Sequence, residues 1–150
     1  MTIANWKYDD FVRANNGKFS VLDFMHAVSA TGILPQDFSV CMARLFSPRL
    51  NMFDNVIVVD EWFDESRYRE YRSQGMSSGQ AQAWVNMIEI TDIFQEISFD
   101  KAKVVAELIA GLWSLIIKRD FPDSSTEASV ISDVDLGEVF VTVGAFSASE

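Results

Sequence analysis

Carboxylates are the most abundant side chains in this chain that could do chemistry, and two groups of them have suggestive spacings. Glu89, Asp92 and Glu96 are three and four residues apart, which would place them on one face of a helix. Paired carboxylates on one face can act as general acid and base. A plain polar face opposite the apolar residues Trp84 and Ile88 explains the same spacing, and we favour that interpretation.

A second acidic group follows a predicted strand and comprises Asp60, Glu61, Asp64 and Glu65. Carboxylate oxygens at a strand end can bind Mg²⁺ or Ca²⁺. The spacing matches no calcium-binding loop, however, and Trp62 and Phe63 separate the two pairs. We therefore interpret these residues as a solvated acidic rim with a helix cap.

The other side chains that carry catalysis are too few for a site. His26 is the only histidine and Cys41 the only cysteine, so neither a nucleophile–base pair nor a zinc site is expected. Gly75 and Gly79 are not followed by the Gly-Lys-Ser/Thr of a phosphate-binding loop. We expect a structural or surface role for His26 and a buried thiol for Cys41. The sequence thus predicts no catalytic residue, no cofactor and no metal, and a protein that is not an enzyme.

The acidic charge is concentrated at the C-terminal end. Residues 120–150 contain no Lys or Arg and contribute −7 of the net charge of −10; the acids there are Asp120, Asp123, Glu127, Asp133, Asp135, Glu138 and Glu150. Apolar and β-branched runs at residues 130–131 and 139–143 indicate strands within this segment. We therefore expect a folded acidic surface, which favours a partner of opposite charge.

The composition predicts one globular domain over residues 1–150. Hydrophobic residues make up 49% of the chain and aromatic residues 13%, which suffices for a core without disulfides. The net charge argues against direct binding to nucleic acid or anionic lipid. The apolar stretch 104–117 is too short to span a bilayer, and no secretion signal precedes it. A cytoplasmic protein without membrane contact is expected.

Hydrophobic spacing and turn residues predict an α+β domain, with helices packed on a small antiparallel sheet built from hairpins. Helices are expected over residues 5–15, 20–32, 35–46, 64–74, 77–97 and 100–119, the second and third forming an antiparallel pair. Ser20, Asp64 and either Ser77 or Ser78 should cap the helices that begin there. Hairpins are expected over residues 50–59, with Asp54 and Asn55 as the turn, and around a turn at 133–137. The helix over 100–119, capped by Asp100, should lie at the centre with Leu108, Leu112 and Trp113 buried.

One basic cluster interrupts the acidic pattern. Arginines and tyrosines alternate in it as Arg67, Tyr68, Arg69, Tyr71 and Arg72, a combination found at protein and nucleic-acid interfaces. Glu65 lies four residues before Arg69, a spacing that forms ion pairs on a helix. A charge-paired solvent face is the interpretation we favour.

Several short segments together resemble bacterial immunity proteins of contact-dependent growth inhibition and other polymorphic toxin systems. They are Phe46-Ser47-Pro48, Val56-Ile57-Val58-Val59-Asp60, Phe63-Asp64, Tyr68, Gly75, Val85-Asn86-Met87-Ile88, Ile90 and Asp92-Ile93-Phe94. The resemblance covers about a third of the chain. It implies a small cytoplasmic protein without a catalytic motif that binds and blocks a cognate toxin domain, often a nuclease. Because interfaces differ between such pairs, the resemblance assigns no binding residue.

The charge distribution points to the same function, since a rigid acidic surface would steer onto the basic cleft of a nuclease and exclude its substrate. The predicted contacts are Asp120, Asp123, Asp133, Asp135 and Glu138, with Asp60, Glu61 and Asp64 as a second patch. A nucleic-acid mimic that inhibits another DNA-binding protein would use the same electrostatics. A carboxylate-dependent enzyme acting through Glu89, Asp92 and Glu96, and an adaptor protein, are the remaining alternatives.

Overall fold

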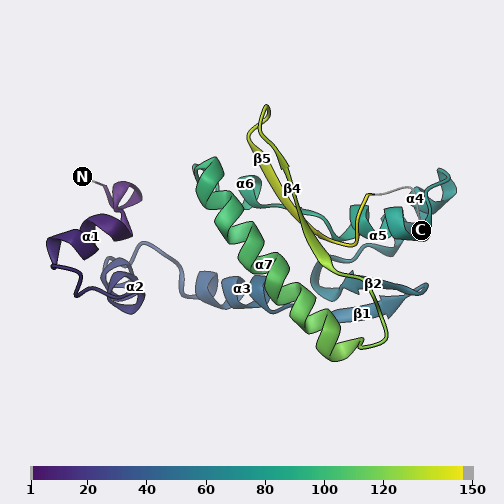
Figure 1. Ribbon diagram of the computed structural model, residues 1–150, viewed down its shortest axis with the longest axis horizontal. Coiled ribbons are helices and arrows are strands. Elements are labelled where there is room, and N and C mark those ends of the chain that lie inside the picture. The colour runs from purple at the N-terminus through teal and green to yellow at the C-terminus, as the bar shows by residue number, and fades with distance from the viewer. Residues whose placement is uncertain (1, 147–150) are drawn as a thin grey trace. The chain divides into compact units, whose positions relative to one another are not determined.

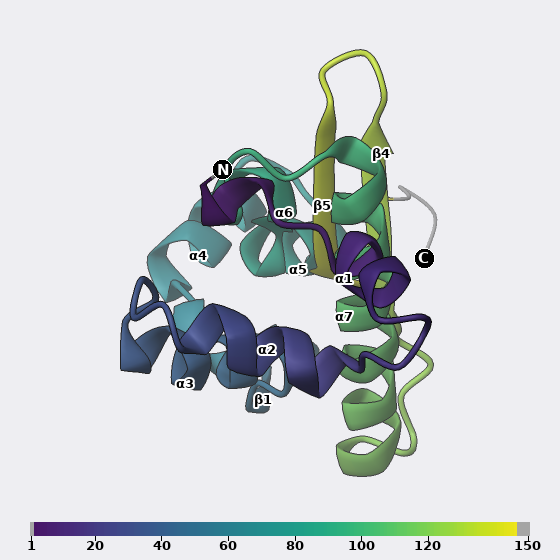
Figure 2. The same cartoon turned by 90° about the vertical axis from the view of Figure 1, so that its left-hand side faces the viewer.

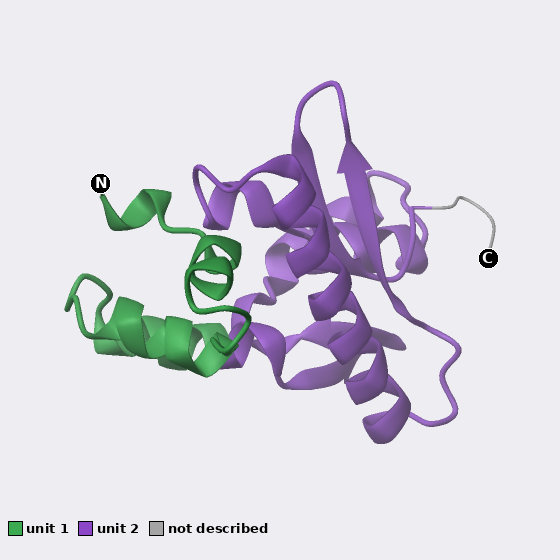
Figure 3. Cartoon of the chain, turned by 60° about the vertical axis from the view of Figure 1, so that its left-hand side comes forward, with its two compact units in different colours: residues 1–42 green, residues 43–150 purple. Residues whose placement is uncertain are grey.

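The computed structural model describes residues 2–146. Contacts within the chain divide it into two compact units, residues 1–42 and 43–150 (Figure 3). The single domain expected from composition stays a prediction, because two compact units can belong to one domain. Among residues 2–146, no helix is both long and apolar enough to cross a membrane.

The first unit is helical. It contains a 3-10 turn, η1 (Ile3–Asn5), and the helices α1 (Tyr8–Ala14) and α2 (Val21–Ser29), while α3 (Gln36–Phe46) begins in this unit and ends in the second. The predicted cap of α2 is confirmed, since Ser20 and Asp23 form a reciprocal capping box. The hydrogen bond from the Ser20 backbone N–H lowers the pKa of the Asp23 carboxyl below its ordinary value.

Two expectations for this unit are wrong. Cys41 is exposed rather than buried, as are its neighbours Phe38 and Val40. The helices α2 and α3 do not form a packed pair, and each residue of α3 from Gln36 to Cys41 is exposed. An apolar run in a short helix is buried only where another element covers it, which the sequence alone did not reveal.

After the end of α3, the second unit continues with the predicted hairpin of β1 (Leu50–Phe53) and β2 (Val56–Val59). Asp54 and Asn55, the two turn residues, both have positive φ, as a two-residue type I′ turn requires. All four side chains of β2 are buried. A 3-10 turn, η2 (Asp60–Trp62), follows the hairpin.

Side-chain amides form hydrogen bonds with the backbone groups of β2 on the edge that does not pair with β1. Gln82 and Asn86 lie on α5 (Ser78–Asn86), which is capped by Ser77, one of the two serines expected there. The Ile57 N–H donates to Gln82 Oε1 and the Val59 N–H to Asn86 Oδ1, each at 2.8 Å. Asn86 Nδ2 in turn donates to the Ile57 carbonyl at 2.8 Å. The helix thereby takes the place of a third strand.

The helix α4 (Glu65–Ser73) has the predicted cap, with Asp64 accepting from the Arg67 N–H at 3.1 Å. Its predicted ion pair is present too, since Arg69 Nε lies 3.2 Å from Glu65 Oε2. Tyr68 is buried and donates to Asp54 Oδ2 at 2.8 Å. Burial, followed by this hydrogen bond to a carboxylate, raises the pKa of Tyr68 to about 12.

The single helix predicted over residues 77–97 is wrong. After Asn86 the chain forms β3 (Ile88–Glu89) and the short helix α6 (Ile90–Ile93). Ile88 and Glu89 pair with Val141 and Phe140, residues distant in sequence, and this pairing interrupts the helix. The strands β3, β5 (Glu138–Val143) and β4 (Ala128–Asp133) form an antiparallel sheet in the order β3-β5-β4.

The longest helix, α7 (Phe99–Asp120), packs across β4 and β5 (Figure 1). Ser98 caps it, not Asp100, because the Lys101 N–H donates to Ser98 Oγ at 3.2 Å. Trp113 is fully buried as predicted, and its Nε1 donates to the Leu45 carbonyl at 2.9 Å. Leu108 and Leu112 were expected to be buried but are 59% and 40% exposed, because the sheet covers only one face of the helix. The predicted α+β class is confirmed.

Candidate protein-binding site

The most prominent acidic element is the hairpin formed by β4 and β5. Its register runs from Ala128↔Val143 to Asp133↔Glu138, and the four residues 134–137 close it. The tip extends past the helices of the second unit (Figures 1 and 2). The expected strand–turn–strand arrangement of the acidic segment is therefore present.

Backbone hydrogen bonds order this tip. The Leu136 N–H donates to Asp133 Oδ1 at 3.1 Å, and the Gly137 N–H donates to the Val134 carbonyl at 3.3 Å. Gly137 has a φ of 67°, a conformation that favours glycine. Val134 and Leu136 consequently point into solvent and are 76% and 69% exposed. The turn therefore exposes two apolar side chains close together in sequence.

Three of the predicted contact residues surround this apolar pair. Asp133 and Asp135 are exposed and Glu138 is half-buried. Within the described part of the chain, none of the three forms an ion pair. Their charge is therefore not cancelled locally. Glu150, the last acid of the segment, lies outside the described residues.

Asp120 and Asp123 lie at the opposite end of the segment from the tip. Asp120 accepts two hydrogen bonds from Arg119, from Nε at 2.7 Å and from Nη2 at 3.0 Å. The bond from Arg119 lowers the pKa of the Asp120 carboxyl. Asp123 is exposed in the loop after α7. The strand β4 separates both residues from the tip, so the five carboxylates of the primary prediction do not form one cluster.

The acids of the second predicted patch have hydrogen-bond or ion-pair partners within the fold. Asp60 Oδ1 accepts a hydrogen bond from Asn51 Nδ2 at 2.7 Å. Glu61 Oε1 lies 3.7 Å from Arg44 Nη1 in an ion pair. Asp64 caps α4. All three are exposed, but their oxygens already have partners. We therefore rank this patch below the hairpin tip.

The carboxylates considered for catalysis do not share a helical face. Glu89 lies on β3 and accepts from Thr91 Oγ1 at 2.7 Å, whereas Asp92 lies on α6. Glu96 follows α6 with a φ of 71°, outside any helix. The expected common face is therefore wrong, because β3 interrupts the helix that would have produced it. In residues 2–146, no group of three or more His, Cys, Asp or Glu side chains is placed to hold a metal ion.

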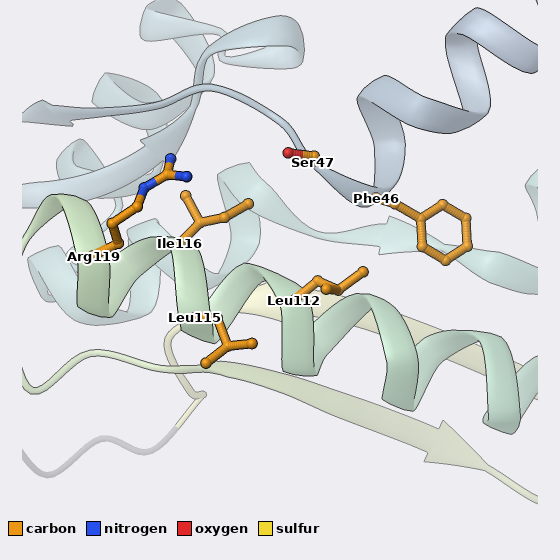
Figure 4. A pocket seen from close by; sticks show the side chains of 6 residues that line it. All are labelled: Phe46, Ser47, Leu112, Leu115, Ile116 and Arg119. Atoms are coloured by element: carbon orange, nitrogen blue, oxygen red, sulfur yellow. The ribbon is translucent and has the colours of Figure 1, made fainter.

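Sequence reasoning missed an apolar surface on α7. Val104, Leu108, Leu112 and Leu115 recur along one side of the helix and are 40–64% exposed. At the C-terminal half of this side is a hollow of about 300 Å³. Figure 4 shows Leu112, Leu115, Ile116 and Arg119 from α7 on one side of it and Phe46 and Ser47 on the other. The spacing of these residues is the same as that of residues facing a core, so the sequence pattern alone could not distinguish an exposed apolar side of the helix from a buried one.

Comparisons of the chain with protein-family models, with curated proteins and with solved structures found no match.

Proposed function

We propose that this protein is an immunity protein that binds and neutralises a cognate bacterial toxin domain, with the tip of the β4–β5 hairpin as its principal contact. The observation that carries the proposal is the hairpin itself. It holds Asp133, Asp135 and Glu138 at an ordered tip, in a segment without Lys or Arg. A partner that fits this surface has a basic cleft, as a nuclease toxin does.

The tip combines the two features from which protein interfaces gain affinity and speed. Val134 and Leu136 are apolar side chains that a partner can bury, and removing apolar surface from water favours association. The surrounding carboxylates attract a basic partner at long range and accelerate association. Because hydrogen bonds already order the turn, little conformational entropy is lost on binding.

The first test is genetic. The gene for an immunity protein should lie beside a gene for a large toxin, and the C-terminal domain of that neighbouring protein supplies the probe. Co-expression of this protein should restore growth to cells that produce the probe. Failure of the purified protein both to bind the probe and to protect cells would refute the proposed function.

The second test removes charge without disturbing the turn. The double substitution Asp133→Asn and Asp135→Asn keeps an oxygen at position 133 that can accept from the Leu136 N–H. Affinity for the probe should fall about tenfold, mainly through slower association, and the salt dependence of association should become shallower.

The matched control is Glu70→Gln with Asp92→Asn, which changes the net charge equally at two exposed acids of the same unit. It should leave the affinity within about threefold, because exposed charges distant from an interface contribute little. If wild-type association is indifferent to salt and the Asp133 and Asp135 variant binds like the control, the hairpin tip is not the contact surface.

A further inference from the structure

The strand β4 is an outer strand of its sheet, and one of its edges is not paired with another strand. The sheet order β3-β5-β4 leaves one side of β4 without a neighbouring strand. Figure 2 shows this side facing away from α5. An open strand edge presents backbone N–H and carbonyl groups that can pair with another strand.

The register identifies which residues present these groups. The Gly144 N–H donates to the Glu127 carbonyl at 2.8 Å, so the odd-numbered residues of β4 bond to β5. The backbone groups of Ala128, Val130 and Ser132 consequently point to the open side. Ser114 on α7 satisfies the first of them, since the Ala128 N–H donates to Ser114 Oγ at 3.0 Å. Within the described chain, no hydrogen bond occupies the outward groups of Val130 and Ser132.

Proteins normally protect such edges with lysine, proline or a bulge. The segment Ala128–Asp133 contains no Lys and no Pro, and its pairing with β5 is continuous from end to end. The side of α7 beside this edge carries Ser114 and, one turn before and after it, Gly111 and Lys118. The exposed apolar residues of α7 lie on another side of the helix. The open edge of β4 is therefore the surface on this side of the sheet that lacks cover.

We propose that an extended segment of the toxin pairs with the open edge of β4 and adds a strand to the sheet. This inference rests on the proposed function and names how the partner binds. The backbone of the added strand would pair with Val130 and Ser132, and alternate side chains would face the side of α7 that carries Ser114.

Charge selects the occupant of this edge. Exposed acids flank it, Glu127 at one end and Asp133 at the other. A second copy of this chain, paired antiparallel, would bring Asp133 of one copy beside Glu127 of the other, and like charges in that position are destabilising. An extended segment of the toxin with Lys or Arg near its ends fits this edge.

The test uses Ser132→Pro against Ser132→Ala in the full chain, with the C-terminal domain of the neighbouring toxin as the probe. The Ser132 N–H points outward, so proline removes a donor to the partner without breaking a bond to β5. Ser132→Pro should weaken binding about tenfold or more, whereas Ser132→Ala should stay within about threefold of wild type. Unfolding curves of both variants show whether the fold is retained.

A second measurement on the wild-type complex does not depend on any variant. Amide hydrogen exchange, resolved by residue, should show new protection at Val130 and Ser132 when the probe binds. Ser129 and Ile131, whose amides already bond to β5, should change little. This alternation distinguishes strand addition from mere proximity. If the wild type binds and neutralises the probe but neither the alternation nor the proline effect is seen, strand addition is refuted and the proposed function stands. If the wild type does not bind, both are refuted.

Discussion

Asn86 offers the sharpest test of how this fold is held together. Its side chain is fully buried and forms two hydrogen bonds of 2.8 Å with β2, accepting from the Val59 N–H and donating to the Ile57 carbonyl. Asn86→Ala would leave both backbone groups buried without a partner, since β1 occupies only the other edge of the strand. Each unsatisfied buried group costs about 1–3 kcal/mol, so we expect a loss of about 3–5 kcal/mol in the free energy of unfolding.

The assay is equilibrium unfolding in urea, followed by tryptophan fluorescence. The control is Asn51→Ala, which also removes an amide hydrogen bond, to Asp60 Oδ1 at 2.7 Å, but at an exposed position. That variant should lose less than about 1 kcal/mol, because water replaces the missing bond. If Asn86→Ala lowered the free energy of unfolding as little as the control does, the Asn86 amide would not stabilise the edge of β2.

The other predictions concern α7, Tyr68 and the two binding surfaces. Trp113→Ala should lower the free energy of unfolding by about 3–5 kcal/mol, whereas Leu112→Ala, at a 40% exposed position, should cost less than about 1.5 kcal/mol; equal losses in urea unfolding would contradict the one-sided burial of α7. Burial raises the pKa of Tyr68 from its ordinary value of 10.0 to about 12 in the folded protein. The protonated side chain therefore contributes fully to the free energy of unfolding below pH 10, and this contribution is lost as the pH rises toward 12. Tyr68→Phe should be less sensitive to pH over that window, and unchanged alkaline sensitivity would count against the assigned pKa. The two remaining predictions concern binding to the probe. The Asp133 and Asp135 variant should associate more slowly, and Ser132→Pro should bind more weakly than Ser132→Ala.

The binding surfaces differ in how far the sequence could define them. The charge of the C-terminal segment can be read directly, and so can the acids of the hairpin turn. The ion pair of Asp120 with Arg119 joins adjacent residues and could have been anticipated. The open edge of β4 could not, because it depends on β5 lying between β3 and β4. Strand order is decided by contacts distant in sequence, and no local pattern encodes it.

Features confined to a few neighbouring residues were determined by the sequence. The caps by Ser20, Asp64 and Ser77 and the turn at Asp54 and Asn55 form where they were expected. Each depends on a side chain and a backbone group within four residues, or on the φ that a turn residue tolerates. Such interactions depend little on the rest of the fold, and the one misplaced cap, Asp100, is only two residues from the actual cap Ser98.

Tertiary structure alone decided which apolar faces are buried and where one long apolar segment breaks. Leu108 and Leu112 have the spacing of core residues, yet the sheet packs against the opposite side of α7, where Ile109 and Trp113 are fully buried. The segment after Asn86 has a helical pattern, but pairing of Ile88 with Val141 makes it a strand. Burial and strand pairing stabilise a segment more than its own propensity does, and both depend on residues that meet only when the chain has folded.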